Sequence, residues 1–136
     1  MSAIALIARH LDELTSDLGI GGRVVETEGR LYVLLDKVPL PPGAYNLTHT
    51  DVMFMTDHQY PLSAMDMFWV EEELLRADGA VPQGGDSVET YVNGRRWRRF
   101  SWHRQGAWRT TGNPLLDHFA LMEARFAIEP GSQVAA

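Results

Sequence analysis

Apolar residues recur at the spacing of an amphipathic α-helix near both ends of the chain. Near the N-terminus they are Ile4, Ile7, Leu11, Leu14 and Leu18, and near the C-terminus they are Leu115, Phe119, Met122 and Phe126. Steps of three and four place each set on one face of a helix. We therefore expect helices over residues 3–18 and from Pro114 to near Glu129, with Asn113 as the N-cap of the second.

The chain between these helices predicts β-strands. Residues 23–27 and 30–35 flank the pair Glu28-Gly29 and predict a hairpin, while residues 51–56 and 66–70 predict two further strands. Residues 87–94 could add another strand and turn. Residues 38–45 hold three prolines and predict a rigid loop, residues 71–75 a helical turn, and residues 78–86 a long loop of the kind that often serves function. The fold class is therefore α+β, with helices packed on a four-stranded antiparallel meander.

Bulk composition limits the class of protein. The chain has 136 residues, 45% hydrophobic residues and no apolar run long enough to cross a bilayer, which indicates one domain over residues 1–129 and a flexible tail over residues 130–136. Its first residues lack the basic segment of a signal peptide, so we expect a cytoplasmic protein without membrane contact. The net charge of −6 disfavours wholesale nucleic-acid binding.

The sequence contains no cysteine. Thiol nucleophiles, disulfides and thiolate metal sites are therefore absent from this chain. His49, His58, His103 and His118 have no pair at ligand spacing on one element, so neither a metal nor another cofactor is expected. His10 is expected at the surface. His118 is expected on the last helix, one turn before Met122, as a boundary residue.

A basic and aromatic stretch runs from Arg95 to Arg109. It holds six of the twelve lysine and arginine residues and three of the four tryptophans, with the short pattern Ser101-x-His103 near its middle. Strand alternation predicts Trp97, Arg99, Ser101 and His103 on one face, and Arg96, Arg98, Phe100 and Trp102 on the other. The stretch is either a basic binding surface or the wall of a reaction site.

In this order of elements, the chain resembles the ubiquitin-conjugating (E2) superfamily, specifically the bacterial branch described as prokaryotic E2 family E. The resemblance rests on Leu40-Pro41-Pro42-Gly43-x-Tyr45 before the third strand, on the structural pair Tyr60-Pro61 after it, and on Phe100-Ser101-x-His103 followed by Trp108. It covers most of the chain. It implies an E2 fold and, as partners, a ubiquitin-like protein and an E1-like activating enzyme.

The chain also departs from the pattern of conventional E2 proteins. These carry a His-Pro-Asn before a catalytic cysteine, and this sequence has neither. Thioester transfer by the domain is therefore excluded. Ser101 stands seven residues before Trp108, close to the place that the resemblance assigns to the cysteine.

Two functional hypotheses follow from this resemblance. In the first, the protein is a transferase that carries a ubiquitin-like protein as an oxyester on Ser101. His103 would assist as base, since side chains two residues apart in an extended segment lie on one face at about 7 Å. Asn93 would donate to the oxyanion, and residues 78–86 would form a flap. In the second hypothesis, the domain is a catalytically silent E2 variant that binds a ubiquitin-like protein or its activating enzyme.

A third hypothesis is a nucleic-acid-binding module, in which arginines contact phosphates and aromatic rings stack on bases. It is the least favoured, because strand alternation predicts that much of the aromatic content serves core or cation–π packing. The basic cluster suits an acidic protein surface equally well. The predicted partner-binding residues are Arg96, Arg98, Arg99, Arg104 and Trp108.

Overall fold

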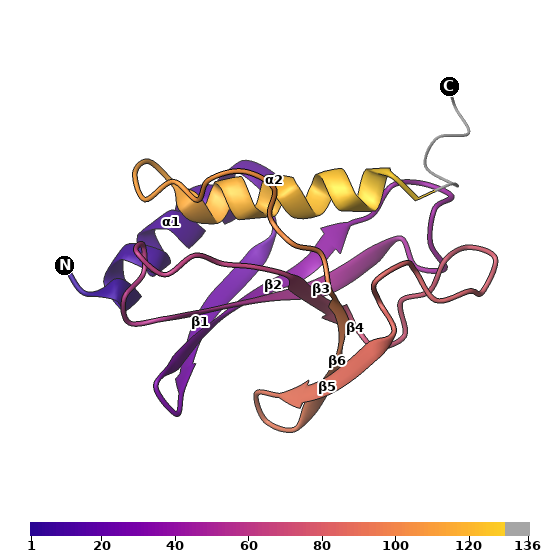
Figure 1. The fold of residues 1–136 in the computed structure, drawn as a ribbon, viewed down its shortest axis with the longest axis horizontal. Coiled ribbons are helices and arrows are strands. Elements are labelled where there is room, and N and C mark those ends of the chain that lie inside the picture. Colours follow the sequence, from indigo (N-terminus) through magenta and orange to yellow (C-terminus); the bar gives the residue numbers. More distant parts are fainter. Residues whose placement is uncertain (130–136) are drawn as a thin grey trace.

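The computed structural model describes residues 1–129 and has two helices packed on one face of a six-stranded antiparallel sheet (Figure 1). The predicted tail over residues 130–136 lies outside the described residues. The elements are α1 (Ala3–Leu18), β1 (Gly21–Thr27), β2 (Arg30–Pro39), β3 (His49–Asp57), β4 (Phe68–Glu71), β5 (Ser87–Tyr91), β6 (Arg95–Phe100) and α2 (Pro114–Ala127). The α+β class is confirmed.

The predicted number of four strands is wrong. The first four strands do form a meander, but β6 pairs with β4 and β5 pairs with β6, so that the strand order is β1-β2-β3-β4-β6-β5. The basic stretch supplies β6 itself. The sequence left open whether this stretch is a strand or a loop, because pairs of arginines are interleaved with aromatic residues along it.

Local signals explain most element boundaries. The Ser2 hydroxyl accepts from the Ala5 amide at the start of α1, and Asn113 accepts from the Leu116 amide at the start of α2. Glu28 and Gly29 both have positive φ, as the two-residue turn of the β1–β2 hairpin requires. The residues 38–45 are not wholly a loop, because β2 continues to Pro39 after a bulge between Leu35 and Val38. Of residues 71–75, which were expected as a helical turn, Glu71 ends β4 and residues 72–73 form a turn in which the Leu74 amide donates to the Glu71 carbonyl at 3.1 Å.

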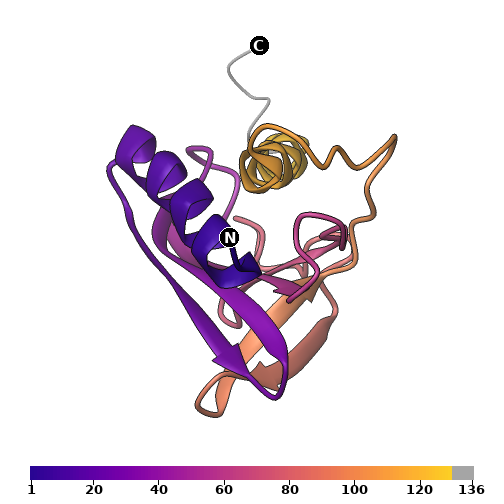
Figure 2. The ribbon, with the colours of Figure 1, turned by 90° about the vertical axis from the view of Figure 1, so that its left-hand side faces the viewer.

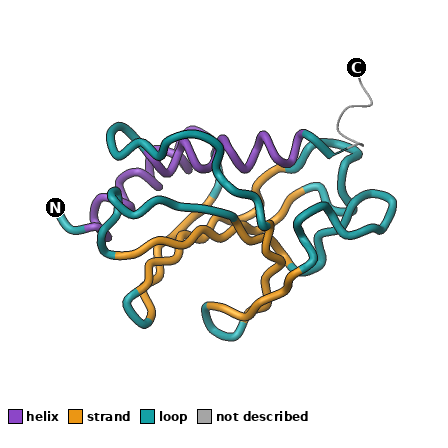
Figure 3. The backbone as a smooth tube through the Cα atoms, viewed as in Figure 1, coloured by secondary structure: helices purple, strands orange, loops and turns teal. Residues whose placement is uncertain are grey.

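The main core lies between the sheet and the two helices (Figures 1 and 3). Ile7 and Leu14 of α1, Phe119 and Phe126 of α2, and Phe54 of β3 are among its fully buried members. His10 is also buried, at 5% exposure, and its Nδ1 is hydrogen-bonded to the Tyr60 hydroxyl at 2.6 Å. The expectation of a surface position for His10 is therefore wrong, because the α1 face that packs on the core includes it.

The opposite face of the sheet carries a second, smaller core. Its buried residues are Tyr32, Leu34, Met53, Trp69 and Trp97. The sheet curls so strongly that the tips of the β1–β2 and β5–β6 hairpins approach each other (Figure 2), and the ring centroid of Tyr91 lies 6.0 Å from that of Tyr32. This closure hides apolar side chains that an open sheet would expose.

Candidate functional site

β6 places its side chains on both faces of the sheet, as strand alternation predicts. Trp97 joins the small outer core, whereas Phe100 joins the main core and stacks on Phe68 at a centroid distance of 4.8 Å. The strand ends at Phe100, so the predicted alternation does not continue to Ser101 and His103. Ser101 instead opens the loop that leads to α2.

The Ser101 hydroxyl is held by a cation. It accepts a 3.2 Å hydrogen bond from Nε of Arg99, whose Nη1 pairs with Glu89 at 2.8 Å. A guanidinium only donates hydrogen bonds and cannot take up a proton. Among the hydrogen bonds of residues 1–129 there is none between Ser101 and His103. The Ser101 hydroxyl and the His103 imidazole are therefore each bonded to another residue in this structure.

His103 pairs with Asp66 instead. The His103 Nδ1 lies 2.7 Å from the Asp66 carboxylate, which also accepts from the Arg104 amide at 3.1 Å. Burial alone would raise the pKa of Asp66, but the hydrogen bonds from His103 and Arg104 outweigh it and the pKa is lowered. Asp66 stays ionised and orients the imidazole through Nδ1, so that Nε2 has no partner within the described part of the chain. No local sequence pattern predicts this pair, because 37 positions separate its members.

Asn93 is not near Ser101. It belongs to the turn between β5 and β6, at the far end of a six-residue strand from Ser101. At about 3.3 Å per residue this is about 20 Å. In this structure Asn93 therefore does not reach an oxyanion formed at Ser101.

The predicted flap lies directly against Ser101. Residues 82–85 form a turn, in which the Gly85 amide donates to the Pro82 carbonyl at 2.9 Å and Gly84 has a φ of +80°. The Gly84 carbonyl accepts from the Ser101 amide at 2.8 Å. A Cβ on Gly84 would meet the Ser101 carbonyl oxygen at 3.6 Å, an ordinary contact distance, so it is the positive φ that favours glycine here.

Two arginines, of which Arg125 is buried and Arg98 half-buried, hold the same turn. Arg98 donates to the Gly85 carbonyl at 2.6 Å, and Arg125 of α2 donates to the Gln83 carbonyl at 2.8 Å. Three successive carbonyls of the flap, at residues 83–85, are thus each bound by a donor on a different element. These hydrogen bonds hold the flap against the Ser101 backbone.

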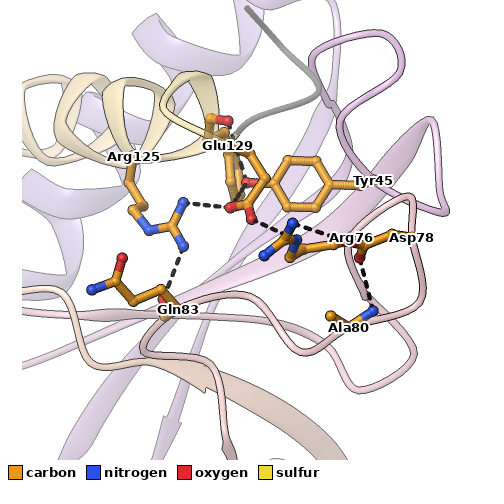
Figure 4. A network of polar contacts seen from close by, with 8 residues as sticks. Tyr45, Arg76, Asp78, Ala80, Gln83, Arg125 and Glu129 are labelled. Carbon is orange, nitrogen blue, oxygen red and sulfur yellow. Dashed lines mark hydrogen bonds and ion pairs between the residues drawn. The ribbon is translucent and has the colours of Figure 1, made fainter.

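Arg125 belongs to a buried polar network at the end of α2 (Figure 4). It is 2% exposed and binds Glu129, which is 4% exposed, at 2.9 Å. Arg76 and the Tyr45 hydroxyl also contact the Glu129 carboxylate, at 3.5 and 3.4 Å. Burial raises the pKa of Tyr45, so its hydroxyl stays protonated and donates. The network joins the Tyr45 loop, the flap and α2.

The arginines predicted to bind a partner contact the chain itself. Arg96 pairs with Glu72, Arg98 also donates to the Glu72 carbonyl, Arg99 pairs with Glu89, and Arg104 contacts His118 at 2.8 Å. Arg96 keeps the most exposed side chain of the four, at 60%. All four arginines are bonded within the chain, and Arg96, which keeps the most exposed side chain, is the one most accessible to a partner.

Three residues on which the resemblance rests, Tyr60, Pro61 and Trp108, lie close together. The Trp108 indole donates to the Pro61 carbonyl at 2.7 Å, and the guanidinium of Arg104 lies 4.8 Å from the Trp108 ring. Tyr60, next to Pro61, is buried and bonded to His10. Trp108, Tyr60 and Pro61 therefore serve to pack the loop between β6 and α2 against the body.

His118 completes the attachment of this loop. It is fully buried, which corrects the expected boundary position, and its Nε2 donates to the Met67 carbonyl while Nδ1 accepts from Arg104. This assignment follows from the partners, since an arginine cannot accept and a carbonyl cannot donate. Burial, and to a lesser extent Arg104, lower the pKa of His118 to about 4 despite the hydrogen bond to Met67. The imidazole is neutral at pH 7.

Over residues 1–129, no three histidine, cysteine, aspartate or glutamate side chains are grouped to bind a metal ion. Neither α1 nor α2, the helices of this described part, is long and apolar enough to cross a bilayer.

The family model described as prokaryotic E2 family E matches residues 9–129. No curated protein matches the chain, and no solved structure matches it. The matched region runs from within α1 past the end of α2, so it includes β6, the flap, Ser101 and the Trp108 loop. The absence of cysteine applies to the whole of this region. The chain therefore belongs to prokaryotic E2 family E.

Proposed function

We propose that this domain is a non-catalytic E2-like component of a ubiquitin-like conjugation pathway. It binds a ubiquitin-like protein or its E1-like activating enzyme and does not accept the modifier covalently. The family suggests the pathway, since E2-like domains act in ubiquitin-like conjugation. What we propose is the non-catalytic role of the domain within that pathway.

The observation that carries the proposal is the environment of Ser101. A serine hydroxyl needs a neighbouring base to become a nucleophile. The partner of the Ser101 hydroxyl is Arg99, which cannot accept a proton, and the imidazole of His103 is bound to Asp66. The flap also occupies the Ser101 amide. These contacts favour a structural role for Ser101.

An adduct assay tests the proposal. The protein is incubated with ATP and with the E1-like enzyme and ubiquitin-like proteins of its source organism, and products are separated with and without a thiol reductant. We expect no covalent product from the natural chain. The Ser101→Cys variant is the matched control, because a thioester formed by it shows that the activating enzyme reaches position 101.

Binding is measured in parallel by calorimetry. We expect Ser101→Ala to bind the ubiquitin-like protein or the activating enzyme as tightly as the natural chain. An adduct that resists reductant, is cleaved by mild base and is lost in Ser101→Ala would overturn the proposal in favour of the oxyester mechanism.

The oxyester mechanism remains the second candidate because of the Asp66–His103 pair. An imidazole oriented through Nδ1 by a carboxylate, with Nε2 open, is the base half of a catalytic triad. If Ser101 turned from Arg99 towards His103, Nε2 would take the hydroxyl proton as Oγ attacks the thioester carbonyl. The carbon–sulfur bond would break, and the thiolate of the activating enzyme would leave. This candidate requires that Asp66→Asn and His103→Asn each reduce adduct formation without weakening binding.

A further inference from the structure

A groove lies on the outer face of the sheet, between the tips of the two hairpins. One wall is formed by residues 25–28 at the β1–β2 turn, and the other by residues 90–94 at the β5–β6 turn. The cavity has a volume of about 380 Å³. We call it the outer groove. It is separate from Ser101, which lies at the opposite end of β6.

Polar groups without partners line the outer groove. Tyr32 is only 6% exposed, yet its hydroxyl makes no hydrogen bond within residues 1–129, and the residue borders the groove. The neighbouring Tyr91 hydroxyl, in contrast, is bonded to Glu89. The side-chain amide of Asn93 likewise has no partner in the described residues. The Tyr32 hydroxyl itself is not a buried atom; it opens to the groove, where it is free to bond to a ligand.

The wall formed by the β5–β6 turn is a strained conformation. Val92, Asn93 and Gly94 have φ values of +43°, +59° and +76° in succession. A β-branched residue in the left-handed region costs on the order of 1–2 kcal/mol, and such strain persists where packing holds it. Val92 packs on the outer core, which fixes this wall of the groove.

The groove is acidic at its rim and apolar at its sides. Glu28, at the β1–β2 turn, has no ion pair among the described residues, and Glu26 beside it is bound to His58. Val25 and Val92 supply apolar surface. Arg30 is a nearby cation, close enough to affect Tyr91. The carboxylates still leave a site that suits a positive charge on an aliphatic stem.

We propose that the outer groove binds a lysine or arginine side chain of a protein partner. The aliphatic stem would pack between Val25 and Val92, and the cationic head would donate to the Tyr32 hydroxyl and the Glu28 carboxylate. The inference does not rest on the proposed function of the Ser101 region, because the two sites share no residue.

Blocked amino acids test this proposal with the full chain. N-acetyl-lysine N-methylamide and N-acetyl-arginine N-methylamide are titrated at low salt while amide chemical shifts are followed by NMR, with the neutral citrulline analogue as the ligand control. We expect saturable shifts confined to residues 25–32 and 90–94. The two cationic probes also show whether lysine or arginine is preferred.

Matched variants locate the contact. Glu28→Gln should weaken binding of the cations by roughly two- to fivefold, the range for an exposed ion pair. Tyr32→Phe removes only the hydroxyl and should also weaken it, while Asp17→Asn on α1 removes an exposed carboxylate elsewhere and should not. The proposal is overturned if no shift is seen at the groove, if citrulline binds equally well, or if Asp17→Asn weakens binding as much as Glu28→Gln.

Discussion

Acidification should destabilise the domain through His118, which holds the loop between β6 and α2. The imidazole is fully buried, accepts from Arg104 and donates to Met67, so a second proton would disrupt the contact with Arg104 and place two cations together. Burial lowers the pKa of His118 in the folded chain from 6.5 to about 4. Between these pH values the unfolded chain binds the proton and the folded chain does not.

The sign and size of the effect follow from this difference. The contribution of His118 to the free energy of unfolding is complete above pH 6.5 and is lost as the pH falls towards 4. A tenfold change in proton affinity corresponds to about 1.4 kcal/mol, so the full loss is about 3 kcal/mol. That is a large part of the stability of a domain of this size.

Urea unfolding between pH 7 and pH 4 measures the effect. The His118→Gln variant is the control, since its amide can contact the same partners and does not titrate. His10, Asp57 and Asp66, whose pKa values are also lowered, remain in both proteins. The natural chain should therefore lose about 3 kcal/mol more than His118→Gln over this range.

NMR titration of the His118 ring provides a direct check, with a midpoint expected near pH 4. A midpoint near 6.5, or parallel loss of stability in the natural chain and in His118→Gln, would refute the reasoning. Either result would mean that the imidazole is solvated or does not face Arg104.

Three further substitutions test the packing around the site. Arg125→Ala should lower the free energy of unfolding in urea by about 3–5 kcal/mol, because it removes a buried cation between the Glu129 carboxylate and the Gln83 carbonyl; a loss below about 1 kcal/mol would contradict this. Trp97→Ala should cost about 3–5 kcal/mol by opening the outer core and Trp97→Phe less, as measured by thermal unfolding, and equal losses would contradict the packing argument. Asn113→Ala should cost about 1–2 kcal/mol by removing the N-cap of α2, and Asn113→Ser should recover most of it in the same assay, unless the hydrogen bond to the His10 carbonyl dominates.

Short-range patterns were sufficient for much of the fold. The helices, the β1–β2 hairpin and the N-cap at Asn113 depend on residues within a few positions of one another, and each was correctly predicted. The family was also recognisable from sequence, because the order of Pro41-Pro42, Tyr60-Pro61 and Trp108 is a one-dimensional property. The place of β6 beside β4 could not be predicted from sequence, since strand pairing depends on contacts between distant segments.

The candidate site also has some features that the sequence determines and others that depend on the tertiary structure. The sequence alone established that this chain has no thiol, so no thioester can form on it whatever the fold. Spacing suggested that Ser101 and His103 act together, but β6 ends at Phe100, and the two side chains bond to Arg99 and Asp66 respectively. Only the tertiary structure decides such partners, because the acceptor nearest to a side chain in space need not be near it in the chain.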